Sequence, residues 1–157
     1  MSRTVAARDI EEDPLLLDRQ VCFPLYAATN LLNRLYGPVL RKLGLTYPQY
    51  LVMLVLWEQQ PQTVGALGAR LYLDSGTLTP LLKRMEAAGF VTRVRDPEDE
   101  RRVMIELTKK GRDLREQAVH VPETIAYGRT PEGIDELRNG VRRLRVHKNR
   151  ERDGNRY

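Results

Sequence analysis

Apolar residues recur every three or four positions along most of this chain, a spacing that predicts a largely helical protein. The first helix is predicted over Leu15–Leu43, with a kink at Gly37–Pro38 and regular turns beginning at Pro24. The next, Pro48–Gln59, is apolar on nearly every side, which indicates a buried helix. The other predicted helices are Val64–Leu73, Ser75–Ala88, Thr108 to about Tyr127 with a bend or restart at Pro122, and Pro131 to about His147.

After the fourth of these helices, the spacing of apolar residues changes from the helical period to a period of two. Alternation predicts two strands, Phe90–Arg95 and Arg102–Leu107, joined by a charged loop over residues 96–101. Asp74 is expected to cap the preceding helix, and Gly89 to end it in a left-handed conformation. The sequence therefore predicts a mostly α protein with one small β-hairpin.

Composition narrows the class of protein. The 157 residues are 41% hydrophobic and 30% charged, with a net charge of +5, which fits a soluble protein with a polyanionic partner. The longest apolar run, Leu51–Trp57, is too short to cross a bilayer, and the first residues lack a signal-peptide core, so we expect a cytoplasmic protein with no membrane partner. The single cysteine, Cys22, excludes an internal disulfide and clustered-cysteine metal sites, and we expect no cofactor.

Two short helices followed by a hairpin with a charged tip is the order of a winged helix-turn-helix domain, which binds double-stranded DNA. The second helix of the pair would enter the major groove, where hydroxyl side chains contact bases or phosphates and cations contact phosphates. The candidate residues on this helix are Ser75, Thr77, Thr79, Lys83 and Arg84. The hairpin, or wing, carries Arg95, Arg101 and Arg102, and an arginine there can enter a narrow, A·T-rich minor groove.

Two segments of the chain resemble the MarR family of winged-helix regulators, namely Leu71–Glu86 and the wing sequence Asp99-Glu100-Arg101-Arg102. More narrowly, Cys22–Tyr26 and Leu45–Tyr50 are similar to the organic hydroperoxide resistance regulators, the OhrR group, of one-cysteine type. The likeness covers about Leu17–Ala126.

The resemblance implies a bacterial homodimeric repressor of a peroxidase gene, released when an organic hydroperoxide oxidises Cys22. It also implies that Tyr36 and Tyr47 of the partner subunit hydrogen-bond the sulfur, and that Asp99 belongs to the wing. The implied organisation is a flexible arm (1–14), an N-terminal dimerisation helix (15–43), the DNA-binding domain (44–108), C-terminal dimerisation helices (109–147) and a disordered tail (148–157). A twofold dimer would prefer a near-palindromic operator.

The chemistry of a sensor thiol is consistent with this position. The thiolate is the reactive form, and a helix N-terminus or hydrogen-bond donors favour it. Oxidation gives a sulfenic acid, which a second thiol can trap as a disulfide. Relatives in this group often carry a resolving cysteine near the place of Tyr127, and here a low-molecular-weight thiol would have to form the mixed disulfide instead. Pro24 is a second departure from the group's pattern, close enough to change the position of Cys22.

Two other functions remain open at this point. The repressor could be released by a small aromatic ligand in the dimer cleft, with Cys22 incidental. An enzyme, a thiol peroxidase using Cys22, would need a resolving thiol and a group that stabilises the leaving oxygen, and neither is evident. We therefore expect a regulator and not an enzyme.

Overall fold

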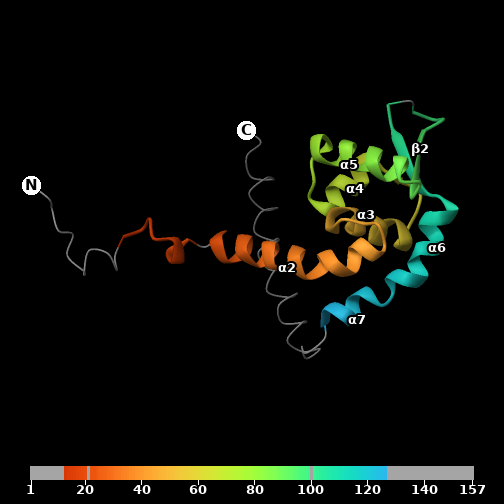
Figure 1. The fold of residues 1–157 in the computed structure, drawn as a ribbon. Helices are drawn as coiled ribbons and strands as arrows, with labels where there is room; N and C mark the ends of the chain where they lie inside the picture. Colours follow the sequence, from red (N-terminus) through yellow and green to blue (C-terminus); the bar gives the residue numbers. More distant parts are fainter. Residues whose placement is uncertain (1–12, 21, 100, 127–157) are drawn as a thin grey trace, which may run out of the picture. The chain divides into compact units, whose positions relative to one another are not determined.

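The computed structural model describes residues 13–20, 22–99 and 101–126 (Figure 1). The chain divides into two compact units, residues 1–117 and residues 118–157, and each is described by itself. Most of the predicted arm, the predicted helix Pro131–His147 and the predicted tail lie outside the described residues. The elements are η1 (Leu17–Arg19), α2 (Cys22–Lys42), α3 (Tyr47–Glu58), β1 (Gln62–Thr63), α4 (Val64–Leu71), α5 (Ser75–Ala87), β2 (Val91–Arg95), β3 (Val103–Leu107), α6 (Lys109–Ala118) and α7 (Val121–Ala126).

The first predicted helix is two elements in the structure. A single turn of 3-10 helix, η1, precedes α2, and α2 begins at Cys22 rather than at Pro24. The prediction of a start at Pro24 was wrong by two residues, because the backbone amides of the whole first turn lack intrahelical acceptors and proline costs little anywhere in it. The helix continues through Gly37 and Pro38 to Lys42.

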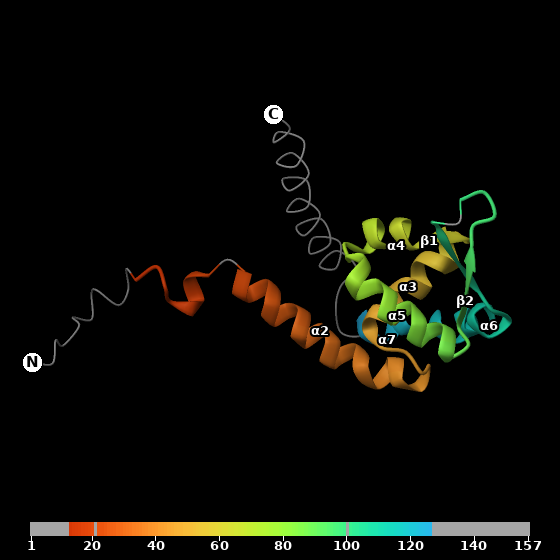
Figure 2. The same cartoon turned by 90° about the horizontal axis from the view of Figure 1, so that it is seen from above.

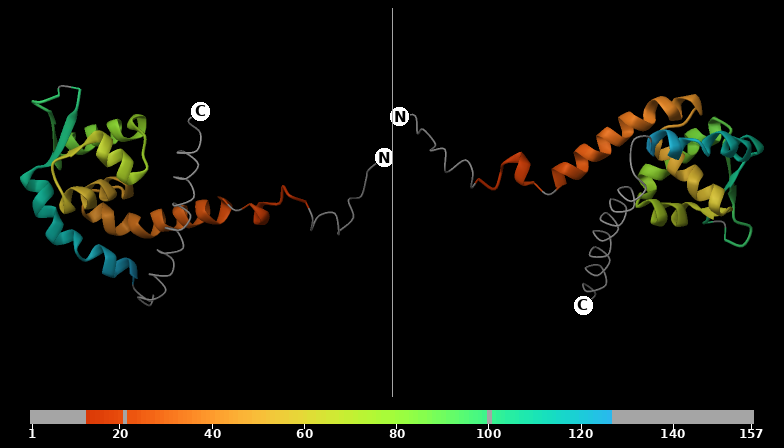
Figure 3. Two further views of the ribbon diagram at one scale, coloured as in Figure 1. Left: turned by 180° about the vertical axis from the view of Figure 1, so that it is seen from behind. Right: turned by 90° about the horizontal axis from the view of Figure 1, so that it is seen from below.

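Helix α3 lies at the centre of the first unit, as its all-round apolar sequence predicts. It packs against α2, α4 and α5 (Figures 1 and 3). The backbone amide of Thr46 donates to Gln49 Oε1 at 2.8 Å, which caps the N-terminus of α3. The fully buried side chains of this unit come from α3 itself and from the elements around it: Leu40, Val52, Met53, Leu56, Leu67, Leu78, Leu82, Met85, Val91 and Ile105.

The α4–α5 pair has the helix-turn-helix arrangement. Thr63 caps α4 by accepting from the amide of Ala66 at 3.0 Å. Helix α4 ends at Leu71 rather than at Leu73, because Tyr72 takes a left-handed φ of 57° and the amide of Leu73 turns back to the carbonyl of Gly68. That close approach requires glycine, since a Cβ at Gly68 would lie 2.7 Å from the carbonyl oxygen of Leu73.

The end of α5 follows the predicted capping pattern closely. Gly89 has a left-handed φ of 77°, and the amide of Phe90 donates to the carbonyl of Met85 at 3.0 Å. The amide of Gly89 donates to Glu86 at 2.9 Å, which completes a Schellman motif. The chain therefore leaves α5 in a fixed direction and enters β2.

The wing is a three-stranded antiparallel sheet with strand order β1-β3-β2, not the two-stranded hairpin predicted (Figure 2). In the hairpin, Val91 is opposite Leu107 and Arg95 is opposite Val103. The extra strand, β1, pairs Gln62 with Ile105. Two residues are too few to show alternation, so only the tertiary contact identifies this strand. The loop between β2 and β3 projects away from the helices (Figure 2).

The following helix is capped at its start, and the restart predicted at Pro122 is present. Thr108 Oγ1 accepts from the amide of Gly111 at 3.0 Å at the start of α6. Helix α6 ends at Ala118, and α7 begins at Val121 with Pro122 in its first turn. Within the described part of the chain, no helix has the length and apolar character needed to span a membrane.

Candidate nucleic-acid interface and thiol site

Helix α5 has one buried face and one face open to solvent. Leu78, Leu82 and Met85 point into the core, whereas Ser75, Thr77, Lys83 and Arg84 are exposed and Thr79 is half-buried. The hydroxyl of Thr77 donates to Asp74 Oδ2 at 3.0 Å, which leaves its lone pairs available as acceptors. The predicted polar side chains of α5 therefore share the solvent side of the helix, with Thr79 at its edge.

Two residues that the sequence analysis did not count as site residues lie on this exposed face. Gly76 and Pro80 are both exposed, one turn apart, and Lys83 follows at the next helical spacing. Helical spacing alone could have identified them, since they lie opposite the buried leucines. Neither carries a long side chain, so the backbone of this part of α5 can approach another surface closely.

The carboxylate of Asp74 holds the N-terminus of α5. It accepts from the amide of Thr77 at 2.8 Å, and this backbone hydrogen bond, followed by the bond from the Thr77 hydroxyl, lowers the pKa of Asp74 below its ordinary value of 3.8. The ionised Asp74 carboxylate therefore stabilises the folded protein at pH values above 3.8. This stabilisation is lost as the pH falls through the lower pKa that Asp74 has in the folded state. Asp74 is a cap, as predicted, and its side chain is engaged within the helix.

An Asp74→Asn variant is expected to show this pH dependence. Asparagine keeps the capping oxygen but not the charge, so wild type should unfold at a higher temperature at pH 7, and the difference should shrink as the pH falls below about 3.8. Thermal unfolding at both pH values, at one ionic strength, measures it. A temperature difference that stays constant across this range would contradict the role of the charge.

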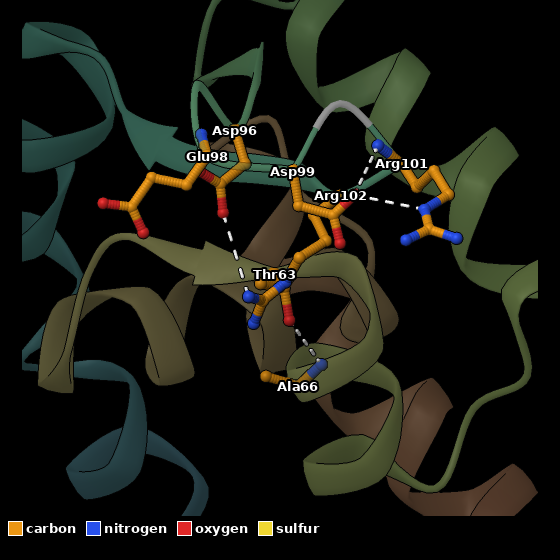
Figure 4. A network of polar contacts seen from close by, with 7 residues as sticks. All are labelled: Thr63, Ala66, Asp96, Glu98, Asp99, Arg101 and Arg102. Carbon is orange, nitrogen blue, oxygen red and sulfur yellow. Dashed lines mark hydrogen bonds and ion pairs between the residues drawn. The ribbon is translucent and has the colours of Figure 1, made fainter.

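The wing tip is ordered by its own carboxylates (Figure 4). Asp99 Oδ1 accepts from the amide of Arg101 at 3.1 Å and lies 3.3 Å from its Nε. Arg102 donates its amide to the Asp99 carbonyl at 2.8 Å, and its guanidinium lies 4.0 Å from Asp96. The Arg101 side chain is 93% exposed, so Asp99 orients a guanidinium that contacts little else. Arg95, on β2, is also exposed.

Replacing Arg101 with alanine is expected to weaken operator affinity about tenfold and to flatten any preference for A·T-rich flanks, because an exposed, oriented guanidinium is lost from the wing. Fluorescence anisotropy at fixed salt, with operators that differ only in their flanks, measures both effects. Arg115→Ala, which removes an exposed charge from α6, is the control for net charge, with its oligomeric state compared with that of wild type by size-exclusion chromatography. Equal losses of operator affinity in the two variants would show that only the net charge of the protein affects binding, and would contradict a specific contact by Arg101.

Arg93 connects β2 to α5, a contact that the sequence did not predict. Its guanidinium lies 3.6 Å from Glu86 on α5, and its Nε is buried with no hydrogen-bond partner among the described residues. The residue belongs to a basic run in the sequence, but only the packing of β2 against α5 distinguishes it from its neighbours.

Cys22 is exposed and is the first residue of α2. Further along α2, the ring of Tyr36 packs against that of Tyr47 of α3 in a tilted arrangement, with centroids 4.8 Å apart and planes at 53°, so the two predicted tyrosines lie together. Burial raises the pKa of Tyr47 above its ordinary value. Fourteen residues of helix separate Cys22 from Tyr36, about 21 Å. Within one chain, Cys22 therefore does not meet the two tyrosines.

Tyr50 is a third member of this aromatic group and was not predicted. It is 3% exposed, and its ring centroid lies 6.1 Å from that of Tyr36. Burial raises the pKa of Tyr50, and the neighbouring phenols of Tyr36 and Tyr47 raise it further. Its place in a buried helix indicated a core residue and nothing more.

The fold and the exposed polar face of α5 define a winged helix-turn-helix protein. A family model described as transcriptional regulator SarA/Rot matches residues 34–117. The chain belongs to this family of MarR-type winged-helix transcriptional regulators.

Individual relatives are similar over most of the chain. The organic hydroperoxide resistance transcriptional regulator of Bacillus subtilis (strain 168) is 54% identical over 113 residues, which are 72% of this chain and 77% of that protein. The structure of reduced AbfR bound to DNA, a protein of Staphylococcus epidermidis, is 36% identical, with a TM-score of 0.69 over 86% of this chain and 98% of that one. Disulfide-formed AbfR is 38% identical, with a TM-score of 0.59 over 87% and 98%.

Proposed function

We propose that this regulator is a DNA-binding repressor that releases its operator when an organic hydroperoxide oxidises Cys22. The observation that carries the proposal is the position of the only thiol of the chain, exposed at the first residue of α2. The N-terminus of a helix bears partial positive charge, which favours negative charge on a side chain there. The thiol is therefore accessible to a peroxide and lies at the N-terminus of a helix.

The relatives support both parts of the proposal. One is named for resistance to organic hydroperoxides, and AbfR has been described reduced on DNA and in a disulfide form. The lack of a second cysteine separates this chain from a protein that closes a disulfide within one subunit.

The oxidation step needs no resident cofactor. The Cys22 thiolate attacks one oxygen of the peroxide, the O–O bond breaks, and an alcohol leaves after taking up a proton. Sulfur loses two electrons and becomes a sulfenic acid, while the peroxide is reduced. A low-molecular-weight thiol then forms a mixed disulfide with Cys22 and water leaves. Each subunit reacts once, so the protein is a stoichiometric sensor rather than an enzyme.

The DNA contacts are proposed for the surface that α5 and the wing present. Helix α5 enters the major groove with Ser75, Thr77 and Thr79 toward bases or phosphates, and Lys83 and Arg84 toward phosphates. The wing reaches the adjacent minor groove with Arg101, oriented by Asp99, while Arg95 and Arg102 add charge. The target is a near-palindromic operator in the bacterial cytoplasm.

A homodimer explains the exposed apolar side chains of the N-terminal segment. Of the α2 residues only Leu40 is buried, whereas Leu25, Tyr26, Leu31 and Leu35 are 46%, 66%, 63% and 42% exposed. Such a surface is costly in water and is typical of an interface. We assign dimerisation to residues 15–43 and 109–147, although residues 127–147 lie outside the described structure. The partner would bring its Tyr36 and Tyr47 to the Cys22 of this chain.

Release from DNA tests the proposal directly. The reduced protein is first used to select an operator from a random DNA library, and fluorescence anisotropy then follows the complex during titration with cumene hydroperoxide. We expect dissociation near one peroxide per subunit in the presence of a small thiol. A complex that survives oxidation, or one that salicylate dissociates while peroxide does not, would overturn the proposal and favour a small aromatic effector.

A further inference from the structure

A row of aromatic side chains runs along α3 away from the two proposed sensor tyrosines. Tyr36 of α2 contacts Tyr50, and Tyr50 contacts Trp57 in an edge-on arrangement with ring centroids 6.5 Å apart and planes at 68°. Tyr50 is buried and Trp57 is half-buried. Closely packed aromatic rings transmit a displacement, because an interior at this density has little free volume. The row therefore connects the α2–α3 contact to the far end of α3.

The far end of this row is hydrogen-bonded to α6. The indole N–H of Trp57 donates to the backbone carbonyl of Gly111 at 2.9 Å, across 54 positions of sequence. Gly111 in turn lies against the end of the recognition helix, since a Cβ at this position would be only 2.1 Å from the carbonyl oxygen of Phe90. An indole has one donor in a fixed direction, so a rotated or shifted Trp57 ring loses this bond.

Residues 88–90 and 108–111 form what we call the α5–α6 junction. The Thr108 hydroxyl donates to the Gly89 carbonyl at 2.6 Å, and Lys110 Nζ donates to the carbonyl of Ala88 at 2.8 Å. The same ammonium group lies 4.5 Å from the centroid of the Phe90 ring. These contacts hold the C-terminus of α5 against the N-terminus of α6. A displacement of Gly111 therefore also displaces α5, the helix proposed to enter the major groove.

We propose that Trp57 is a positioning residue that couples the arrangement of Tyr36 and Tyr47 to the α5–α6 junction and thereby to the recognition helix. The inference rests on the proposed function, because it assigns a route by which oxidation of Cys22 reaches α5. Loss of the sulfur contact in the dimer lets the Tyr36–Tyr47 pair repack, Tyr50 and Trp57 follow, and the bond to Gly111 is broken. The junction then holds α5 in a second position.

Trp57 is the only tryptophan of the chain, so its fluorescence reports on this route in the intact protein. Cumene hydroperoxide is expected to shift the Trp57 emission of wild type, and the Cys22→Ser protein is expected to show no shift. Emission that is unchanged while peroxide releases wild type from DNA would overturn the inference, whatever any Trp57 variant does.

A Trp57→Phe variant tests the hydrogen bond, since phenylalanine keeps a ring against Tyr50 but has no donor. We expect operator affinity of the reduced protein within twofold of wild type, and an unchanged rate of Cys22 oxidation measured by mass spectrometry. The ratio of reduced to oxidised operator affinity should fall roughly fivefold, the effect of one hydrogen bond. Gln60→Met is the matched control, because it removes a comparable bond, Gln60 Oε1 to the Leu107 amide at 2.7 Å, that does not reach α6.

The outcomes separate this inference from the proposed function. A wild-type protein that stays on DNA after oxidation would refute the sensor itself. Normal release of wild type, with equally complete release of Trp57→Phe, would refute the role of Trp57 alone. Equal losses of affinity in both redox states would make Trp57 a purely structural residue and would also refute it.

Discussion

Serine in place of Cys22 is expected to leave operator binding intact and to abolish release by organic hydroperoxide. The side chain is exposed at the start of α2, so exchanging sulfur for oxygen disturbs no buried contact within the subunit, and a serine hydroxyl can still hydrogen-bond the partner's tyrosines. A hydroxyl group is not oxidised by a peroxide under conditions that oxidise a thiolate. Wild type should lose about 5- to 150-fold in affinity on oxidation, the usual range for coupling between two sites, and the variant less than twofold.

The control for Cys22→Ser must account for the other oxidisable sulfur atoms. The chain contains four methionines, and methionine oxidation also converts an apolar side chain into a polar one. The variant and wild type are therefore compared over the same peroxide titration, with intact mass recorded at each point. Release of both proteins at the same peroxide concentration would assign sensing to methionine, or to no specific residue, and would contradict the role of Cys22.

Helix α5 could be predicted from sequence because its boundaries depend on residues within a few positions of one another. Asp74 caps it through the amide of Thr77, and Gly89 ends it with the backbone geometry that glycine permits. The apolar stripe that contains Leu78 and Leu82 then decides which face is exposed. Local chemistry of this kind can be read from a sequence.

Features that depend on distant contacts could not be predicted in this way. Strand β1 exists only because Gln62 lies opposite Ile105, and the role of Trp57 depends on Gly111. Likewise, nothing in the sequence distinguishes Arg93 from the other arginines, because its ion pair with Glu86 depends on the packing of β2 against α5. These contacts join residues far apart in the chain, so no short sequence pattern predicts them.

The candidate thiol site shows the same division. The sequence identifies Cys22 as the sole cysteine near a helix start, and a resemblance supplied Tyr36 and Tyr47. The structure adds that the rings of the two tyrosines are in contact and that Tyr50 extends the group into the core. One subunit cannot complete the site, because α2 keeps Cys22 far from the pair.

Alanine at Gly111 is expected to destabilise the protein by about 3 kcal/mol, the upper range for adding a methyl group to a packed site. Helix propensity alone predicts the opposite sign, since alanine is favoured over glycine by about 1 kcal/mol within a helix. Here the added carbon would lie 2.1 Å from the carbonyl oxygen of Phe90 and 3.2 Å from the Leu107 side chain. Neither a backbone carbonyl nor a core leucine can move far, so sterics outweigh propensity.

Gly65→Ala is the matched control for this substitution. Gly65 also lies in a helix, α4, but a Cβ there would meet only the Thr63 hydroxyl, at 3.9 Å, so alanine should be neutral or stabilise by up to about 1 kcal/mol. Denaturant unfolding of both variants and wild type at one protein concentration gives the free energies, since a dimer's stability depends on concentration. Equal, small changes in the free energy of unfolding at the two positions would show that the backbone of the α5–α6 junction moves easily to accept a methyl group. Such a flexible junction could not make α5 and α6 move together, and oxidation would then need another route to α5.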